Sequence, residues 1–231
     1  MNRQSSVLVV AAHPDDEVLG CGGSIARWVR EGWRVCVMFI ADGESARRGA
    51  GISDLSARIR QRREAAWAAA EILGHEVIES LEMPDNRLDS VPLLEVVQQI
   101  ERVIETTKPS RVVTHRPDDL NVDHEVTSRA VVTAVRPFAT PGPVDVLMFD
   151  SPSASEWSHL RTLRHAMPNY FVDVTSAIDL KHAALSCYAG EMRESPHPRS
   201  WETLAAVARA HGAACGVDAA EAFVAHRVVE T

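Results

Sequence analysis

The sequence predicts one α/β domain that is built on a mostly parallel β-sheet and carries a C-terminal elaboration. Three observations support this: short apolar segments of strand length, amphipathic segments of helical length between them, and a loss of this alternation in the last third. Strands that alternate with helices form βαβ units, whose right-handed crossovers place helices on both faces of a parallel sheet. No internal repeat or linker divides the chain, so we expect a single domain over residues 1–231.

The individual elements follow from hydrophobic periodicity. Continuous β-branched apolar runs indicate strands buried on both faces, and apolar residues three or four positions apart indicate helices. Glycine or a Lys-Pro pair marks several helix ends. The expected strands are 6–12, 34–40, 76–81, 111–114, 144–150 and 170–174. The expected helices are 18–29, 55–73, 91–107, 125–135, 177–192 and 201–210, with 222–229 either a strand or a helix.

The composition narrows the possible functions. The chain has 32 Asp and Glu residues against 24 Lys and Arg residues, which gives a net charge of −8 at pH 7. Such an acidic chain is poorly suited to general binding of nucleic acids or anionic membranes. The apolar run at 7–12 is too short to span a bilayer, and the four cysteines include no Cys-x-x-Cys pair. We therefore expect a cytoplasmic protein with reduced thiols and neither nucleic acid nor membrane as a partner.

Histidine and aspartate gather in the loops that follow two of the predicted strands. The first strand is followed by His-Pro-Asp-Asp-Glu at 13–17, and the fourth by a His- and Asp-rich segment at 115–124. Ligands of open α/β sheets bind beyond the carboxyl ends of the strands, where these loops meet. Converging imidazoles and carboxylates suit a catalytic zinc ion, which takes three protein ligands and keeps one position open for water.

Three of these residues would supply a suitable ligand set. His13, Asp16 and His124 offer two nitrogens and one oxygen, which leaves the adjacent Asp15 to remove a proton from water. The acidic residues at 15–17 also precede a helical pattern, where carboxylates are favoured as caps and by the helix dipole. That second interpretation explains the acids but neither His13 nor the later loop. From spacing alone, both interpretations stay open.

The motifs resemble those of a known family. His-Pro-Asp-Asp-Glu after a first strand, with Asp123-His124 opening a later helix, is similar to the PIG-L/LmbE-type family of zinc-dependent N-acetyl-sugar deacetylases. Weaker similarities lie at Arg62, in a helix that ends Ile-Leu-Gly, and at Pro84-Asp85. Together with the segment 181–223, they extend the resemblance over nearly the whole chain.

The resemblance implies a fold, a cofactor and an activity. The fold would be a Rossmann-like three-layer α/β/α sandwich. One Zn²⁺ per chain would be bound by His13, Asp16 and His124, with Asp15 as the general base. The activity would be removal of the acetyl group from an N-acetyl amino sugar of the GlcNAc type, which releases acetate and a free amine.

The resemblance also implies which residues contact the substrate. Arg62 would face the substrate, and Asp85 would contact the hydroxyl groups of the sugar. The substrate would be a small molecule such as a GlcNAc glycoside, a nucleotide sugar or a related conjugate.

One position departs from the family pattern. The family often has a histidine three residues before the second zinc histidine, where this chain has Asn121. Asparagine can donate a hydrogen bond to an oxyanion but cannot deliver a proton at neutral pH. The general acid therefore stays open among Asp15, His115 and His197. Some members complete the pocket with a late histidine from a neighbouring subunit, which makes His197 a candidate catalytic residue and a homo-oligomer an expected state.

Two other functions compete with this interpretation. A nucleotide-binding oxidoreductase of the Rossmann type is disfavoured, because a Gly-x-Gly-x-x-Gly count from Gly20 ends on Ile25 and the cluster lies inside a helical pattern. Close packing on the sheet explains those glycines better. A non-catalytic metal-binding scaffold is suggested by Asn121. The sequence specifies neither the sugar nor the role of the polar loop 41–54.

Overall fold

A computed structural model describes residues 5–47, 52–140, 142–159 and 167–230, and it confirms the α/β prediction. Within these residues, seven strands form one sheet in the order β3-β2-β1-β4-β5-β7-β6. The first five strands along the chain pair in parallel, whereas β7 runs antiparallel to both β5 and β6. The strands are β1 (Ser6–Ala11), β2 (Arg34–Ala41), β3 (Glu76–Met83), β4 (Arg111–His115), β5 (Asp145–Phe149), β6 (Tyr170–Asp173) and β7 (Ala220–Arg227).

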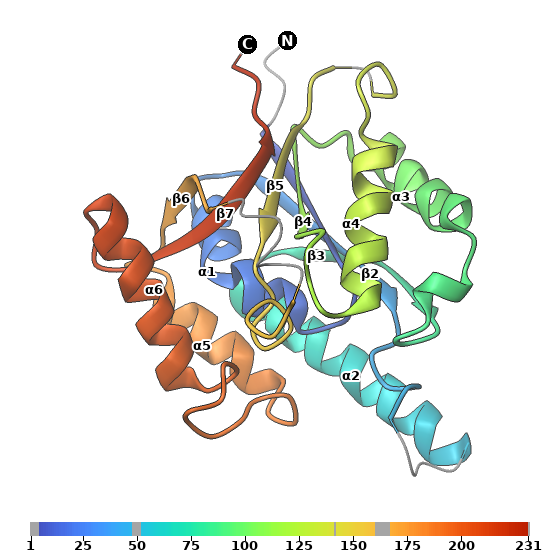
Figure 1. Cartoon of the computed structure of the whole chain (residues 1–231), viewed down its shortest axis with the longest axis horizontal. Coiled ribbons are helices and arrows are strands. Elements are labelled where there is room, and N and C mark those ends of the chain that lie inside the picture. The colour runs from blue at the N-terminus through green and yellow to red at the C-terminus, as the bar shows by residue number, and fades with distance from the viewer. Residues whose placement is uncertain (1–4, 48–51, 141, 160–166, 231) are drawn as a thin grey trace.

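Helices cover both faces of this sheet and complete the three expected layers (Figure 1). One buried apolar cluster lies under α1, α2, α5 and α6, and a second lies under α3 and α4. No helix in the described part of the chain is long and apolar enough to cross a membrane. The helices are α1 (Asp16–Arg30), α2 (Ile52–Leu73), the 3₁₀ turn η1 (Leu88–Ser90), α3 (Leu93–Thr107), α4 (Val122–Ala134), α5 (Ile178–Cys187) and α6 (Trp201–Cys215).

The last third of the chain differs most from the expected elements. The helix expected at 177–192 ends at Cys187, and the one expected at 201–210 continues to Cys215, where Gly216 ends it in the left-handed region. The segment for which strand and helix stayed open is a strand, β7. The expected loop 41–54 is shorter, because α2 begins at Ile52, and its positions 48–51 lie outside the described residues.

The strand order places two loops at the same point of the sheet. β1 pairs with β2 on one side and with β4 on the other, so the order of strands along the chain reverses between β1 and β4. Such a reversal opens a crevice beyond the carboxyl ends of the strands. The loops that follow β1 and β4 therefore meet, and they are the loops rich in His and Asp.

The C-terminal elaboration supports α1 from behind. This helix is kinked at Cys21, and its second part begins where the Glu221 carboxylate accepts hydrogen bonds from the backbone N–H groups of Gly23 and Ser24 at 3.0 and 2.7 Å. Lys181 from α5 pairs with the same carboxylate at 2.6 Å. Because Glu221 lies in β7, the end of the chain stabilises the helix that carries the first loop.

The glycines near the start of α1 serve packing rather than phosphate binding. A Cβ atom at Gly20 would overlap the ring of Phe149, and one at Gly23 would come within 2.9 Å of Val174. The α1 backbone therefore lies directly against side chains of the sheet and its C-terminal part, as expected for close packing.

Replacing Gly20 by Ala should destabilise the fold. We expect a net loss of about 1 to 2 kcal/mol, because overpacking costs roughly 1–3 kcal/mol and helix propensity returns up to about 1 kcal/mol. Urea unfolding followed by circular dichroism measures the change. Gly190→Ala is the matched control, since its added Cβ would have no atom within 4 Å. Equal unfolding midpoints for the two variants would contradict the packing explanation.

Candidate metal centre

The three residues expected to hold a metal ion lie together at the crevice. His13 follows β1, Asp16 is the first residue of α1, and His124 lies in the first turn of α4. The Oδ2 atom of Asp16 is 3.2 Å from Nδ1 of His13 and 3.3 Å from Nε2 of His124. All three side chains are buried, and one ligand atom from each lies within 4.8 Å of the others. This spacing suits a shared metal ion.

The local backbone explains why these side chains converge. The apolar strand β1 ends just before His13, whose N–H donates to Asp16 Oδ2 at 2.9 Å and tightens the turn into α1. Asn121 is the N-cap of α4, because its Oδ1 accepts from the N–H of Asp123 at 2.9 Å. This cap fixes the start of α4 and places His124 toward β1.

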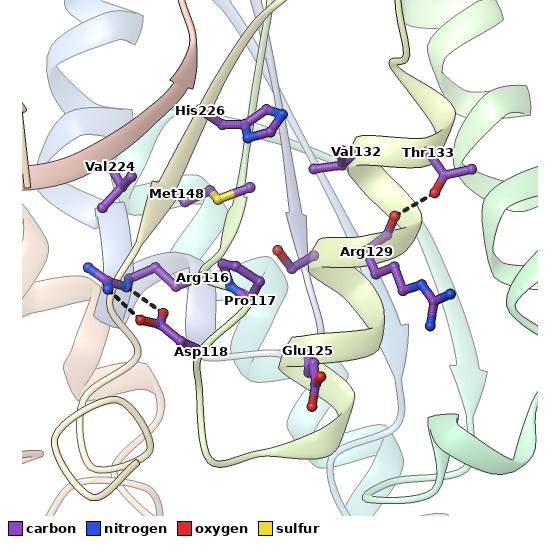
Figure 2. A pocket seen from close by; sticks show the side chains of 11 residues that line it. Arg116, Pro117, Asp118, Glu125, Arg129, Val132, Thr133, Met148, Val224 and His226 are labelled. Carbon is purple, nitrogen blue, oxygen red and sulfur yellow. Dashed lines mark hydrogen bonds and ion pairs between the residues drawn. The ribbon is translucent and has the colours of Figure 1, made fainter. Parts of the chain in front are cut away.

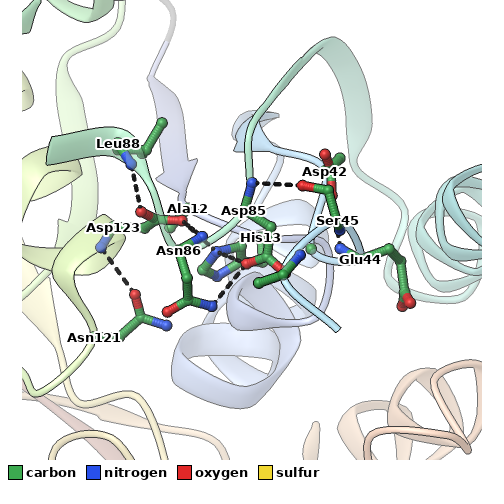
Figure 3. A network of polar contacts seen from close by, with 12 residues as sticks. Ala12, His13, Asp42, Glu44, Ser45, Asp85, Asn86, Leu88, Asn121 and Asp123 are labelled. Carbon is green, nitrogen blue, oxygen red and sulfur yellow. Dashed lines mark hydrogen bonds and ion pairs between the residues drawn. The ribbon is translucent and has the colours of Figure 1, made fainter. Parts of the chain in front are cut away.

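Buried carboxylates hold both histidine rings from behind. His13 Nε2 lies 3.0 Å from Asp123 Oδ2 and 3.2 Å from Asp85 Oδ1, as the network in Figure 3 shows. His124 Nδ1 lies 3.1 Å from Asp119 Oδ1. Each ring therefore keeps its other nitrogen for the centre. Such outer carboxylates orient the rings of metal-binding histidines and raise their basicity.

Atoms at the centre fit a bound cation. Oδ1 of Asp16 and both ring nitrogens of His124 are buried and make no hydrogen bond of good geometry among the described residues, although the ring lies within ion-pair distance of Asp16 and Asp119. Burial opposes the charged form of His124, but Asp16 and Asp119 outweigh it and raise its pKa to about 9. Hydrogen bonds to surrounding carboxylates likewise outweigh burial and raise the pKa of His13. Since the carboxylates favour positive charge here, a divalent cation suits the site.

A second group of ligand-type residues shares His13 but is already satisfied. His13, Asp85 and Asp123 also come within ligand distance of one another. Both oxygens of Asp123, however, accept backbone hydrogen bonds, from Asn86 at 2.6 Å and from Leu88 at 2.9 Å. The first group holds the unsatisfied atoms, so we assign the candidate metal position to it.

Asp15 belongs to neither group of ligand-type residues, and its carboxylate contacts arginine side chains. Its Oδ2 accepts from Nη1 of Arg199 at 3.2 Å and lies 3.8 Å from Nη1 of Arg62. Burial raises the pKa of Asp15 to about 6, although both arginines act in the opposite direction. The carboxylate of Asp15 is therefore adjacent to the centre and separate from its three ligands.

Arg62 forms one wall of a small cavity beside Asp15. Its Nη1 lies 2.7 Å from Oε1 of Glu191, whose carboxylate also pairs with Arg47 at 2.6 Å. The cavity has a volume of about 230 Å³. Its lining includes Glu44, Arg47, Arg58, Arg62, Tyr188 and Glu191. Three arginines against two glutamates give this space the potential to bind polar or anionic groups.

The other expected residues lie in different settings. The His197 ring contacts Trp157 edge-on, with 5.4 Å between ring centroids, and its Nδ1 accepts from the N–H of Arg199 at 3.0 Å. His115 stacks on His124 and engages both ring nitrogens, with the N–H of Ala12 and the hydroxyl of Ser151, each at 2.8 Å. His115 therefore has no proton free for a leaving group. The catalytic role of His197 stays a prediction.

Three residues of the site had no role in the sequence interpretation. Arg199 contacts Asp15 from the C-terminal elaboration, and Tyr188 reaches Glu17 behind it. Glu17 is fully buried, and this burial raises its pKa to about 8. For Arg199 and Tyr188, the sequence signal was the weak family resemblance of the segment 181–223, which assigned neither residue a role.

A separate cavity lies between α4 and the strands β5 and β7 (Figure 2). It has a volume of about 470 Å³, and its floor includes Met148 and Val224. Arg116 in its wall is already paired with Asp118 through hydrogen bonds of 2.8 and 2.7 Å. None of the candidate metal ligands lines it. We therefore place the chemistry at the His/Asp centre.

The chain is similar to known proteins over most of its length. The family model PIG-L, described as GlcNAc-PI de-N-acetylase, matches residues 8–135, which include all three candidate ligands. A 4-oxalmesaconate hydratase from Pseudomonas putida is 34% identical over 206 residues, covering 81% of this chain and 74% of the relative.

Two deacetylases are also similar. The diacetylchitobiose deacetylase of Thermococcus kodakarensis is 27% identical over 84% of this chain and 72% of the relative. The solved structure of N,N'-diacetylchitobiose deacetylase from Pyrococcus horikoshii superposes with a TM-score of 0.76, covers 95% of this chain and 82% of its own, and is 22% identical. The fold is thus shared with a solved deacetylase.

Replacing His124 by Ala should remove the bound metal. We expect the wild type to bind one equivalent of zinc and the purified variant to bind none, because two ligands rarely hold the ion that three hold. Elemental analysis after dialysis against a known zinc concentration measures this stoichiometry. His182→Ala is the control, because this histidine stacks on Trp201 away from the centre. Retention of one tightly bound zinc by His124→Ala would show that the ligand assignment is wrong.

Proposed function

The chain belongs to the PIG-L family of GlcNAc-PI de-N-acetylases, and on this premise we propose that it is a zinc-dependent N-deacetylase of an N-acetyl amino sugar. The observation that carries the proposal is the adjacent placement of two different groups. Asp16 and His124 offer buried atoms without a hydrogen-bond partner, and His13 lies within ligand distance of both. The carboxylate of Asp15 is outside this group and contacts Arg199. Amide hydrolysis by a metal enzyme needs both.

The proposed reaction assigns a step to each residue. Zinc held by His13, Asp16 and His124 would lower the pKa of a bound water to about 7 and act as a Lewis acid. Asp15 accepts a proton from the attacking water and returns it to the leaving amine, so the products are acetate and a free amino sugar. Asn121 donates its amide N–H to the developing oxyanion, since its Oδ1 already caps α4.

Substrate binding is proposed at Arg62 and Asp85. Arg62 lines the cavity beside Asp15 and can donate to the oxygens of a sugar. Asp85 lies against His13, which places it between the proposed ligand and the loop of Ser45. From this position it can accept from a sugar hydroxyl while it orients His13.

We also propose a setting for the enzyme. The four cysteines are free thiols, which suits a reducing cytoplasm. We keep the homo-oligomer as a proposal, with His197, whose ring packs edge-on against Trp157, as the residue that a neighbouring subunit could share.

A second candidate function is hydration of an unsaturated carboxylate. Two observations favour it: Arg62 and Arg199 flank Asp15, and the relative named 4-oxalmesaconate hydratase is 34% identical. Guanidinium groups bind carboxylates in two-point geometry. Deacetylation and hydration would both activate water at the same centre, so an assay with the two kinds of substrate is needed to distinguish the two functions.

Replacing Asp15 by Asn should abolish turnover and leave the metal in place. We expect release of acetate from GlcNAc glycosides to fall by a factor of about 100 to 10,000, the usual contribution of a positioned base. Zinc content should stay at one equivalent, because no ligand is changed. Asp89→Asn, on the exposed turn η1, is the control. Turnover near the wild-type level in Asp15→Asn would exclude Asp15 as the base.

The same preparations discriminate between the two functions. We expect wild-type protein to release acetate and a primary amine from a GlcNAc glycoside, and to leave 4-oxalmesaconate unchanged in its ultraviolet absorbance. Hydration of 4-oxalmesaconate without release of acetate would replace the deacetylase proposal with the hydratase.

A further inference from the structure

Asp15 adopts a backbone conformation that its residue type disfavours. Its φ is 132° and its ψ is −30°, in a region where a side chain clashes with the neighbouring backbone. Residues held in such regions cost on the order of 1–3 kcal/mol and persist only where the surrounding contacts impose them. The contacts that impose this conformation therefore bear on the proposed base.

Ordinary helix capping does not account for the conformation. Asp15 occupies the N-cap of α1, and its carbonyl accepts from the N–H groups of Val18 and Leu19 at 3.1 and 2.9 Å. Its side chain, however, makes no capping hydrogen bond. The carboxylate that would normally cap the helix instead points to Arg62 and Arg199.

Glu17 and Tyr188 hold the backbone of Asp15 from the opposite side. The N–H of Asp15 donates to Oε2 of Glu17 at 3.0 Å. The other oxygen of that carboxylate, Oε1, accepts from the hydroxyl of Tyr188 at 2.7 Å. Both side chains are buried, with exposed fractions of 0% for Glu17 and 3% for Tyr188. This chain of two hydrogen bonds fixes the peptide group that precedes the Asp15 side chain.

The pair is a costly way to stabilise the fold. A buried carboxyl group is costly even when it is hydrogen-bonded, and an apolar side chain of similar size would fill the same space at lower cost. An apolar residue at position 17 would leave the N–H of Asp15 without its acceptor. The pair therefore fits a role that requires this N–H to be held in place.

We propose that Glu17 and Tyr188 form a positioning pair that fixes the backbone of Asp15 and so directs its carboxylate toward the water and the leaving amine. This inference rests on the proposed role of Asp15 as the base. Glu17 is fully buried and the hydroxyl of Tyr188 is directed at Glu17, so both act through Asp15 and are positioning residues. The Asp15 carboxylate is then fixed independently from its other side by Arg199.

A double-mutant cycle tests the pair. Tyr188→Phe keeps the volume and removes one hydrogen bond, and we expect it to lower kcat about 10-fold with KM unchanged, since small misplacements of catalytic groups cost up to about 100-fold. In the Asp15→Asn background the same change should alter the residual turnover less than about 2-fold, because the positioned base is already absent. Equal losses in both backgrounds would overturn the proposal and indicate a general structural role.

Variants of Glu17 provide the conservative comparison. Glu17→Gln keeps an oxygen for the N–H of Asp15 and an N–H for Tyr188, so we expect kcat within about 5-fold of the wild type. Glu17→Ala removes both contacts and should lower kcat about 100-fold. Equal kcat for Gln and Ala would reject the pair. If Glu17→Ala does not fold, Glu17→Gln is compared with Tyr188→Phe instead. A loss of kcat in Glu17→Gln that equals or exceeds the loss in Tyr188→Phe would contradict the hydrogen-bond chain.

Two further measurements separate this inference from the proposed function. Zinc stoichiometry and affinity should stay within about 2-fold of wild type in Tyr188→Phe, because the ligands are untouched. Tyr170→Phe, in β6, is the control for loss of a tyrosine hydroxyl. Wild-type turnover in Asp15→Asn would overturn the base and the pair together. Loss of turnover in Asp15→Asn together with wild-type kcat in Tyr188→Phe would overturn the pair alone.

Discussion

Charge balance within a buried site is the constraint on which the rest of this structure depends. Asp16, Asp119 and Asp123 are nearly inaccessible to solvent, and the rings of His13 and His124 lie between them. Buried carboxylates need compensating positive charge and hydrogen bonds. The carboxylates raise the pKa values of both histidines, which favours positive charge at this point. A divalent cation at the same point meets the same need without protonated rings.

Arginines balance the charge of the buried carboxylates next to this centre in the same way. Asp15 and Glu191 are both buried, and the guanidinium groups of Arg62 and Arg199 lie between them. Arg199 therefore contacts these two carboxylates, and Arg62 contacts both of them and Glu44. The site consists of an inner group of imidazoles around Asp16 and an outer group of guanidiniums around Asp15. This division gives two neighbouring aspartates different environments, which their separate proposed roles require.

Most of the fold was predictable from the sequence, because its signals are local. Continuous apolar runs identified the buried parallel strands, and the His-Pro-Asp-Asp-Glu motif led to the three residues that meet at the centre. The contacts to Arg199 and Tyr188 were not predictable, because they join segments more than 170 residues apart. The positive φ of Asp15 was not predictable either, because a His-Pro-Asp-Asp motif before a helix has the sequence of an ordinary N-cap.

The C-terminal elaboration supports α1, so two separate parts of the chain build the site. The segment 8–135 supplies every candidate metal ligand, whereas Glu221, Tyr188 and Arg199 hold the helix and the base from beyond it. Sequence change in the later part can therefore move the proposed base, Asp15, without changing any candidate metal ligand. A lineage could in this way exchange one water-dependent reaction for another through its C-terminal third, with the candidate metal ligands left intact.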